Sequence, residues 1–420
     1  MSATPRNRVR PYFLIASCVG LLLAAIACVP RRGAPAAPTT NWVAAWEAPP
    51  QLTEQRNLPP APGLTGSTLR QTLRASIPGT RWRIRVSNEF GDGPLTFSSV
   101  HVARGLAGRD TVETATDARA TFGRRDTVTI PAGGAAVSDV VALAAPSLAD
   151  LVVSMYIISA PAGVTGHPGS RTTSYLLQGN RADARTLPGA SKTEHWYLLS
   201  RIDVVAPPNA AAVVILGNSI ADGRGSGTDK NDRWPDNLAR RLRAGAATKD
   251  VSVLNAGIGG NAVVTGGLGP AALQRLDRDV LDQPGVRWLI VSEGVNDLGA
   301  SRSGLADSVA TKLIGAYREI VTRAHARHLR VYGATILPFG ASFYATPDRE
   351  AARRRINAWI RTTGNFDDVI DFDAVMRDSA DPTRLRSDAD SGDHLHPNEN
   401  GYRIMAEAIE LTLFAEKYEN

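Results

Sequence analysis

The stretch AAVVILGNSI at residues 211–220 decides the fold of the second half of this 420-residue chain. Its first six residues are apolar without alternation, which is typical of a strand that is buried on both faces of a parallel sheet. The run stops at Gly217, and Ser219 follows within three residues of the last apolar position. Because ligand sites in open α/β sheets lie at the carboxyl ends of the strands, the sequence predicts Ser219 at such a site.

The rest of this half repeats the pattern of a short apolar run followed by a segment of helical length. Such alternation predicts a parallel sheet with right-handed connections and helices on both faces, which is a three-layer α/β/α sandwich. The further strand candidates are residues 251–254, 288–291, 331–335 and 369–371, and the helix candidates are residues 232–247, 270–283, 305–328, 347–363 and 399–415.

The first half of the chain has a different pattern, in which short β-rich runs recur between turn residues. In RWRIRV at residues 81–86 apolar residues alternate with arginines, as in a strand with one solvent-exposed face. Similar runs occupy residues 127–130 and 151–158. A chain of this length also exceeds one typical core. We therefore predict an antiparallel, jelly-roll-like β-sandwich over residues 41–204 and an α/β domain over residues 205–420.

The first 27 residues are predicted to be a signal peptide. Three arginines within residues 6–10 precede an apolar run from Tyr12 to Ala27, which is too short for the roughly 20 residues that cross a bilayer. Cys28 directly after the cut resembles a bacterial lipoprotein signal, in which that cysteine is lipidated, while the AIA at residues 25–27 also fits ordinary cleavage. We expect an exported protein, either a periplasmic or cell-envelope lipoprotein or a secreted one, with residues 28–40 as a flexible tether.

Charge and cysteine content restrict the class of protein further. Cys18 and Cys28 both lie in or beside the signal peptide, so the mature chain is expected to have no intramolecular disulfide. The formal charge of +6 falls to +3 when the three arginines of the signal peptide are subtracted. This charge is too weak and too dispersed to indicate a nucleic-acid partner, and no cofactor is predicted.

Ser219, His396 and Asp393 are the candidates for a nucleophile, its base and the group that orients the base. A serine hydroxyl is inert near neutral pH unless a base accepts its proton, and imidazole titrates in this range. Asp393 lies three residues before His396 and would accept from the other ring nitrogen. Each residue also has an ordinary structural alternative: a helix N-cap, a surface histidine and a turn former. Together and in this order they indicate a serine hydrolase.

Four motifs carry a resemblance to a known family: GNSI at residues 217–220, NAGIGGN at 255–261, GVND at 294–297 and DHLH at 393–396. In this order, over residues 208 to 415, they resemble the SGNH hydrolases, also called GDSL esterases or lipases. The preceding β-rich half resembles the secreted, two-domain type with an N-terminal β-sandwich. The resemblance implies a flavodoxin-like parallel sheet for the second half.

The same resemblance implies an oxyanion hole made by the backbone N–H groups of Ser219 and Gly260 and the side-chain amide of Asn296. A side chain at Gly260 would block close approach of the backbone to the substrate, and Asn296 offers a neutral donor. The alternatives are an ordinary turn glycine and a left-handed loop residue. The chain departs from the family at Asn218, where the family has an aspartate that supports the catalytic loops.

The predicted function is that of an exported serine carboxylic-ester hydrolase that acts through an acyl-enzyme. The resemblance implies short acyl esters, such as acetyl esters of polysaccharides. A broad arylesterase or lipase is the rival, and an inactive carbohydrate-binding relative or a metal-dependent hydrolase using the acidic loop at residues 388–396 are further alternatives. No metal ligand is assigned.

Two weaker features complete the sequence analysis. The loop PFGASFY at residues 338–344 is a candidate either for an apolar wall of the active site or for a contact with the neighbouring domain. His167, Arg171 and Tyr175 in the first half are candidates for a shared cleft, although we expect a structural role for them.

Overall fold

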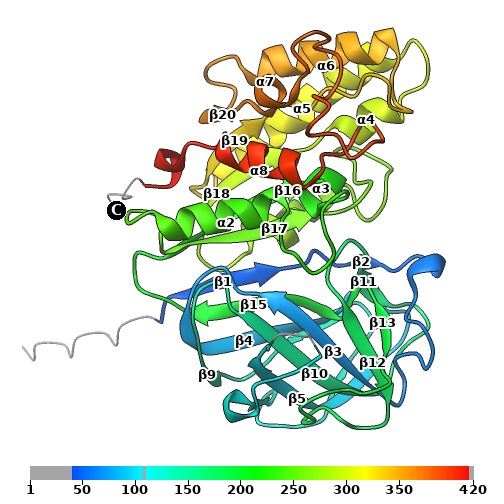
Figure 1. Cartoon of the computed structure of the whole chain (residues 1–420), viewed down its shortest axis with the longest axis vertical. Helices are drawn as coiled ribbons and strands as arrows, with labels where there is room; N and C mark the ends of the chain where they lie inside the picture. Colours follow the sequence, from blue (N-terminus) through cyan, green and yellow to red (C-terminus); the bar gives the residue numbers. More distant parts are fainter. Residues whose placement is uncertain (1–39, 107–109, 416–420) are drawn as a thin grey trace, which may run out of the picture. The chain divides into compact units, whose positions relative to one another are not determined.

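The computed structural model describes residues 40–106 and 110–415 (Figure 1). The predicted signal peptide, Cys28 and nearly all of the predicted tether lie outside the described residues. Within the described residues no helix is both long enough and apolar enough to span a membrane.

The chain from Trp42 to Val205, here called the β part, consists of antiparallel sheets. One sheet has the order β1-β15-β4-β8 with β9 also on β4, a second has the order β13-β12-β3-β10-β5-β6 with β7 also on β5, and a small third sheet has the order β14-β11-β2. The strands are β1 (Trp42–Glu47), β2 (Gln51–Leu52), β3 (Ser67–Arg74), β4 (Gly79–Asn88), β5 (Leu95–Arg104), β6 (Ala118–Ala120), β7 (Val128–Ile130), β8 (Gly134–Val137), β9 (Val141–Ala145), β10 (Asp150–Ser159), β11 (Thr165–His167), β12 (Ser174–Gln178), β13 (Ser191–Thr193), β14 (Trp196–Tyr197) and β15 (Leu199–Val205), with 3-10 turns η1 (Gln55–Asn57) and η2 (Thr114–Thr116).

Side-chain alternation explains why these runs form half-buried strands. In β4, Trp82, Ile84 and Val86 are buried, while the intervening arginines are at least partly exposed. The buried residues of β4 belong to the same hydrophobic core as Leu69 of β3 and Phe97 of β5, which lie in the other large sheet. The predicted antiparallel β-rich half is therefore confirmed.

The second part, here called the α/β part, is built on one parallel sheet with the strand order β17-β16-β18-β19-β20. Numbered along the chain this order is 2-1-3-4-5, which is the flavodoxin-like order that the family resemblance implies. The elements are β16 (Ala211–Gly217), α1 (Ser219–Asp222), α2 (Trp234–Ala244), β17 (Val251–Gly257), α3 (Ala272–Leu276), a π-helical turn η3 (Asp277–Leu281), β18 (Val286–Ser292), α4 (Val295–Gly299), α5 (Ala306–His325), β19 (Arg330–Ala334), α6 (Pro347–Ile360), β20 (Asp368–Ile370), α7 (Phe372–Met376), α8 (Glu399–Glu407) and the 3-10 turn η4 (Leu411–Phe414).

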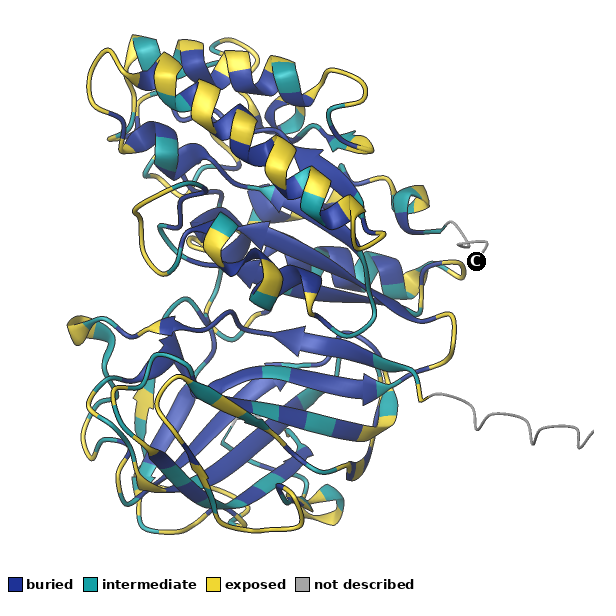
Figure 2. Cartoon of the chain, turned by 180° about the vertical axis from the view of Figure 1, so that it is seen from behind, coloured by how far each residue is buried: buried dark blue, intermediate teal, exposed yellow. Residues whose placement is uncertain are grey.

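Burial follows from this layered arrangement. All seven residues of β16 are buried, as expected for a central strand that is covered on both faces. Helices α2 and α8 lie on the near side of the sheet in Figure 1, and the view from behind in Figure 2 shows other helices across the opposite face. The predicted three-layer α/β/α sandwich is confirmed.

The last predicted helix is shorter than its expected range of residues 399–415. Helix α8 ends at Glu407, and the chain forms the separate turn η4 after it. The guanidinium of Arg241 on α2 donates to the carbonyls of Ala406 and Ile409, so two carbonyl groups at this end are satisfied by a side chain. A side chain from another helix is not visible in a local sequence pattern, and the prediction was therefore too long.

Buried hydrogen bonds join the β part to the α/β part, and all described residues belong to one compact unit that starts at Thr40. The Ser252 hydroxyl on β17 donates to the Ala44 carbonyl on β1 at 2.7 Å, and the Ala44 N–H donates to the Pro284 carbonyl at 2.9 Å. The change from antiparallel to parallel strands falls between β15 and β16. The division into separate domains at residues 204 and 205 stays a prediction.

Candidate active site

Ser219 begins the short helix α1, directly after the central strand β16. The helix is capped by Asn218, whose Oδ1 accepts the Ile220 N–H at 3.0 Å, so Ser219 is not the N-cap residue. Its hydroxyl is therefore free for another partner, and Ser219 Oγ lies 2.8 Å from His396 Nε2. The sharp turn from the sheet into a helix presents this hydroxyl at the carboxyl end of the strand.

His396 and Asp393 reach Ser219 from the loop that precedes α8. His396 Nδ1 lies 2.7 Å from Asp393 Oδ2, and Asp393 Oδ1 also accepts the His396 N–H at 2.8 Å. A carboxylate can only accept hydrogen bonds, so the ring proton lies on Nδ1 and leaves Nε2 to accept from the Ser219 hydroxyl. The structure thus brings the three predicted residues into one chain of hydrogen bonds, while their catalytic roles stay predictions.

The environment lowers the pKa values of both Asp393 and His396, for different reasons. Burial raises the pKa of Asp393, but the backbone N–H and the ring of His396 outweigh it and hold this pKa at about 2. For His396, burial is the largest cause of a lowered pKa, Asp393 opposes it, and the guanidiniums of Arg224 and Arg171 lower the pKa further. Near neutral pH, His396 is therefore neutral and able to accept a proton.

We expect the acid limb of the pH profile of kcat/KM to fall below the ordinary imidazole pKa of about 6.5. The neutral ring is the base, so a lowered pKa of His396 keeps the base available at lower pH. The measurement is kcat/KM of the wild-type enzyme on an uncharged short-chain ester between pH 4 and 8. An inflection above about 7 would contradict the environment described for His396.

The neighbouring His394 has a different partner. Its side chain is 50% exposed and its Nδ1 lies 2.6 Å from Asp390 Oδ2, whereas His396 is buried. Within residues 40–106 and 110–415, no group of three or more His, Cys, Asp or Glu side chains is arranged to hold a metal ion. The acidic loop thus divides into two separate carboxylate–histidine pairs.

The three predicted oxyanion donors line the same cleft as Ser219 and His396. The first N–H groups of a helix have no partner within it, and Ser219 is the first residue of α1. Gly260 has a φ of +72°, a left-handed conformation that a residue without a side chain adopts without strain. Both residues therefore border the cleft, and the role of their backbone N–H groups as oxyanion donors stays a prediction.

Asn296 lies on helix α4 and is held from both sides of its amide group. Its Nδ2 donates to the Asn261 carbonyl at 2.7 Å, and its Oδ1 accepts from the Tyr344 hydroxyl at 3.1 Å. An amide nitrogen has two N–H groups, so one remains for a substrate oxygen in the cleft. The alternative of a left-handed loop residue does not hold, because the left-handed residue here is Gly294 with a φ of +110°.

We expect Asn296→Ala to lower kcat by about 10²- to 10³-fold with little change in KM, because its hydrogen bond strengthens only as charge develops on the carbonyl oxygen. Tyr344→Phe is the matched control: it removes the bond to Asn296 Oδ1 and leaves the amide donor in place, so we expect a smaller loss. Steady-state kinetics and melting curves of both variants decide the matter. A lowered melting temperature with unchanged kcat in Asn296→Ala would remove this residue from the oxyanion hole.

Asn218, the departure from the family pattern, pairs with a buried carboxyl group. Its Nδ2 donates to Glu293 Oε2 at 3.0 Å, a bond that an ionised aspartate at this position could not donate. Burial is the main cause that raises the pKa of Glu293 to about 8, against the nearby Arg275. The amide of Asn218 thus joins the nucleophile loop to the end of β18 without adding a second carboxylate beside Glu293.

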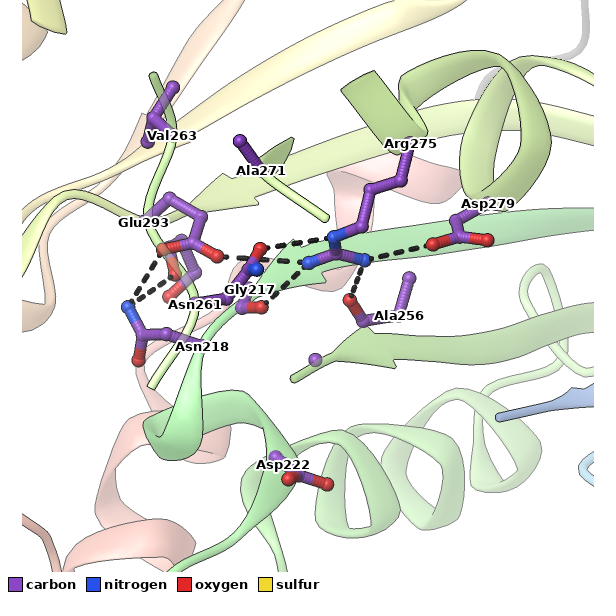
Figure 3. A network of polar contacts seen from close by, with 12 residues as sticks. Gly217, Asn218, Asp222, Ala256, Asn261, Val263, Ala271, Arg275, Asp279 and Glu293 are labelled. Carbon is purple, nitrogen blue, oxygen red and sulfur yellow. Dashed lines mark hydrogen bonds and ion pairs between the residues drawn. The ribbon is translucent and has the colours of Figure 1, made fainter. Parts of the chain in front are cut away.

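Arg275 connects several loops of the site through a fully buried guanidinium (Figure 3). Its Nη2 donates to the Gly217 carbonyl at 3.0 Å, its Nη1 to the Ala256 carbonyl at 2.7 Å, and its Nε to Asn261 Oδ1 at 3.0 Å. Asn261 is also the residue whose carbonyl holds Asn296. One side chain therefore positions the strand ends before Ser219 and Gly260 and supports the third oxyanion donor.

Asp222 is a second positioning residue that the sequence analysis missed. Its Oδ2 accepts the Gly259 N–H at 3.0 Å, next to Gly260, and its Oδ1 lies 2.9 Å from His167 Nε2 of the β part. Gly169 is required beside this pair, because an added Cβ would lie 1.7 Å from Asp222 Oδ2. His167 therefore has the expected structural role, but it acts on a loop of the active site.

The cleft around Ser219 has a volume of about 470 Å³ and takes residues from both parts of the chain. The α/β part contributes Phe343, which is 73% exposed, and Tyr344, whose ring centroid lies 4.3 Å from that of Phe343. Of the three candidates in the β part, Arg171 lines the cleft, His167 lies behind it, and Tyr175 is not among the lining residues. The loop at residues 338–344 thus forms part of the wall.

Comparison with known proteins finds one family model that matches most of the α/β part. The model of the GDSL-like Lipase/Acylhydrolase family matches residues 215–404. A search of curated protein sequences found no match.

Several solved structures are each similar to about half of the chain. A lipase/acylhydrolase from Enterococcus faecalis is 19% identical, with 49% of this chain and 95% of that chain covered and a TM-score of 0.39. An acetylxylan esterase from Geobacillus stearothermophilus is 19% identical, with 48% and 92% covered and a TM-score of 0.37. The psychrotrophic esterase EstA from Pseudoalteromonas sp. is 19% identical, with 47% and 93% covered and a TM-score of 0.36.

Proposed function

We propose that the protein works as a serine esterase through an acyl-enzyme. Residues 215–404 match the GDSL-like lipase/acylhydrolase family, and this match supports a carboxylic-ester hydrolase. The observation that supports this mechanism is the continuous hydrogen-bond chain from Ser219 through His396 to Asp393. Such a chain supplies a nucleophile, a base and a group that orients the base.

In the first half of the reaction, Ser219 Oγ attacks the ester carbonyl while His396 Nε2 takes its proton. The resulting imidazolium is stabilised by Asp393, and the negative oxygen accepts hydrogen bonds from the N–H groups of Ser219 and Gly260 and from the Asn296 amide. His396 then gives the proton to the leaving alcohol as the carbon–oxygen bond breaks. The products of this half-reaction are the free alcohol and an acyl group on Ser219.

In the second half, water attacks the acyl-enzyme and His396 accepts one of its protons. A second tetrahedral intermediate forms in the same oxyanion hole and collapses when His396 returns the proton to Ser219 Oγ. The carboxylic acid leaves, and the enzyme returns to its starting state. Besides the ester and water, these steps use the side chains and backbone groups described above.

For the substrate, we propose short acyl esters, including acetyl esters on polysaccharides. The exposed ring of Phe343 beside Tyr344 supports this proposal, because aromatic faces provide a large apolar surface for a sugar ring or another flat group. The same wall would suit an aryl ester, so a broad arylesterase or lipase is the rival specificity.

A panel of p-nitrophenyl esters of increasing chain length, run beside acetylated xylan and acetylated pectin, tests both proposals. Release of acetate from a polymer together with a loss of kcat/KM beyond short acyl chains is the expected result. A kcat/KM that rises with acyl chain length, without release of acetate from the polymers, would favour the lipase. A lack of turnover on every ester, with the Ser219→Ala variant as the blank, would overturn the serine esterase mechanism.

We also propose that the chain is exported and anchored through a lipid on Cys28. The support is the basic segment, the short apolar run and the small residues before this cysteine. Expression of the full chain in a bacterium with labelled palmitate is expected to label the wild-type protein and not a Cys28→Ser variant. Equal labelling of both would contradict the anchor, and a mature protein that still begins at residue 1 would contradict export.

A further inference from the structure

Three arginine side chains line the cleft around Ser219 without a close carboxylate partner. Arg56 and Arg171 come from the β part, and Arg224 follows α1 in the α/β part. Within residues 40–106 and 110–415, neither Arg56 nor Arg171 forms an ion pair, and Arg224 Nε lies 4.0 Å from Asp393 Oδ2, at the outer limit of one. Some other arginines of the described residues have close carboxylate partners, as Arg353 has in Glu350 and Asp373.

The acidic side chains of the cleft keep their charge, but the hydrogen bonds they accept come from groups other than these three guanidiniums. Asp222 binds His167 and the Gly259 N–H, and Asp393 binds His396. Glu54 accepts hydrogen bonds from the side-chain amides of Gln51 and Asn57, both at 2.9 Å. The guanidiniums are therefore the groups of this cleft with unused hydrogen-bonding capacity.

Arg171 is the most constrained of the three. Its Nε is buried and has no hydrogen-bond partner, although the residue as a whole is only half-buried. Its backbone has a φ of +50°, and its carbonyl is held by the Asp229 N–H at 2.9 Å. Backbone strain of this kind clusters at functional sites, and a buried donor without a partner calls for an explanation such as a bound ligand.

Arg171 and Arg224 also act on the base of the reaction. Both guanidiniums lower the pKa of His396 and so disfavour the imidazolium that forms in the transition state. An anionic group of the substrate placed between them would remove this unfavourable effect during the chemical step. Such an anion would therefore stabilise the transition state as well as the bound substrate.

We propose that Arg171 and Arg224 form a subsite for a carboxylate that the ester substrate carries on its alcohol portion. The proposal rests on the serine esterase mechanism proposed above and names the substrate class for it: esters of hydroxy acids, including acidic sugars. A guanidinium presents a planar pair of N–H donors that matches the two oxygens of a carboxylate. Arg56 in the same cleft adds positive charge at its more exposed end.

A matched pair of substrates tests the subsite: 4-acetoxybenzoate, which carries a carboxylate, and 4-acetoxybenzamide, which has the same shape and acyl group but no charge. The neutral amide withdraws electrons more strongly, so a preference for the carboxylate cannot come from the reactivity of the ester. At low salt we expect wild-type kcat/KM to be about tenfold higher for the carboxylate, as for other charge-assisted pairs. The preference is expected to shrink as salt is added, because salt screens the arginines.

The variants Arg171→Gln and Arg224→Gln are each expected to lower the ratio of the two kcat/KM values severalfold. Arg119→Gln is the control, since Arg119 is an exposed arginine of the β part that pairs with Asp126 and does not line the cleft. Its ratio is expected to equal that of the wild type. If an arginine variant fails to fold, the salt dependence of the wild-type kcat/KM ratio still tests the proposal.

The outcomes separate this proposal from the one on which it rests. Turnover of the neutral ester with a ratio of one or less would overturn the carboxylate subsite and leave the serine esterase mechanism standing. Failure to hydrolyse either ester would count against the mechanism itself. A larger gain for 4-acetoxyphenyl phosphate than for 4-acetoxybenzoate would overturn the assignment to a carboxylate in favour of a phosphate group.

Discussion

Ser219→Ala is expected to lower kcat by several orders of magnitude while the melting temperature stays close to that of the wild type. The members of a serine triad act as a unit, and loss of the nucleophile removes the acyl-enzyme route, which in such enzymes costs about 10⁴- to 10⁶-fold. The fold should tolerate the change because the hydroxyl does not cap helix α1, whose N-cap is Asn218.

Two measurements check this result. Initial rates on a short-chain p-nitrophenyl ester would show more than about a tenth of wild-type activity if Ser219 were not the nucleophile. A serine-directed phosphonate is expected to label Ser219 of the wild type, and peptide mapping of the adduct to any other residue would count equally against the assignment. Asn218→Ala serves as the structural comparison, since it removes the cap and the bond to Glu293 but keeps the hydroxyl.

His396→Ala is expected to be nearly as inactive as the serine variant, whereas His394→Ala should change kcat/KM by less than about threefold. The two histidines lie in the same loop and differ in their partners, because His396 bonds to Ser219 and Asp393 while His394 bonds to Asp390. The loss in His396→Ala has a direct cause: without the base, the serine hydroxyl keeps its proton near neutral pH.

The same pair of variants distinguishes the serine mechanism from metal-assisted hydrolysis. Equal losses in His394→Ala and His396→Ala would contradict the separate roles given to these residues. Loss of activity in EDTA with recovery on adding zinc would replace the serine mechanism with a metal-dependent one. Melting curves of both variants show whether a lost activity reflects the chemistry or the fold.

Much of the fold of the α/β part could be predicted from local patterns. The apolar run at residues 211–216 corresponds to strand β16 (Ala211–Gly217), which pairs with β17 on one side and β18 on the other. Its continuous apolar character reflects burial on both faces. Helix α8 ends at Glu407 instead of residue 415, because its terminal carbonyls are bound by a side chain of α2, which no local pattern reveals.

The candidate site was predictable where a residue carries its own chemical signal. Ser219, Gly260, Asn296, Asp393 and His396 each follow a strand or lie in a motif of recognisable spacing, and the structure brings all five to one cleft. Their catalytic roles stay predictions until the variants are measured. The residues that position them have no such signal.

The sequence analysis missed the residues whose hydrogen-bond partners are distant in the sequence. Arg275 on α3 was an ordinary arginine of a predicted helix, yet its buried guanidinium joins Gly217, Ala256 and Asn261. Asp222 lies three residues after Ser219, which in retrospect is the one local indication of a role. Its partner His167 is 55 residues away in the other part of the chain.

The sequence by itself determined the order of strands and helices, the family motifs and the candidates for the reacting groups, because hydrophobic periodicity and side-chain chemistry are local properties. Only the tertiary structure decided which side chains hold those groups in place, since that depends on contacts between residues far apart in the chain. The tertiary structure also decided which other side chains enter the cleft, as it does for Arg171 of the β part, for which the sequence analysis expected a structural role. It lies in the cleft with an unpaired guanidinium because folding brings its loop beside Ser219 and His396 and supplies no carboxylate for it.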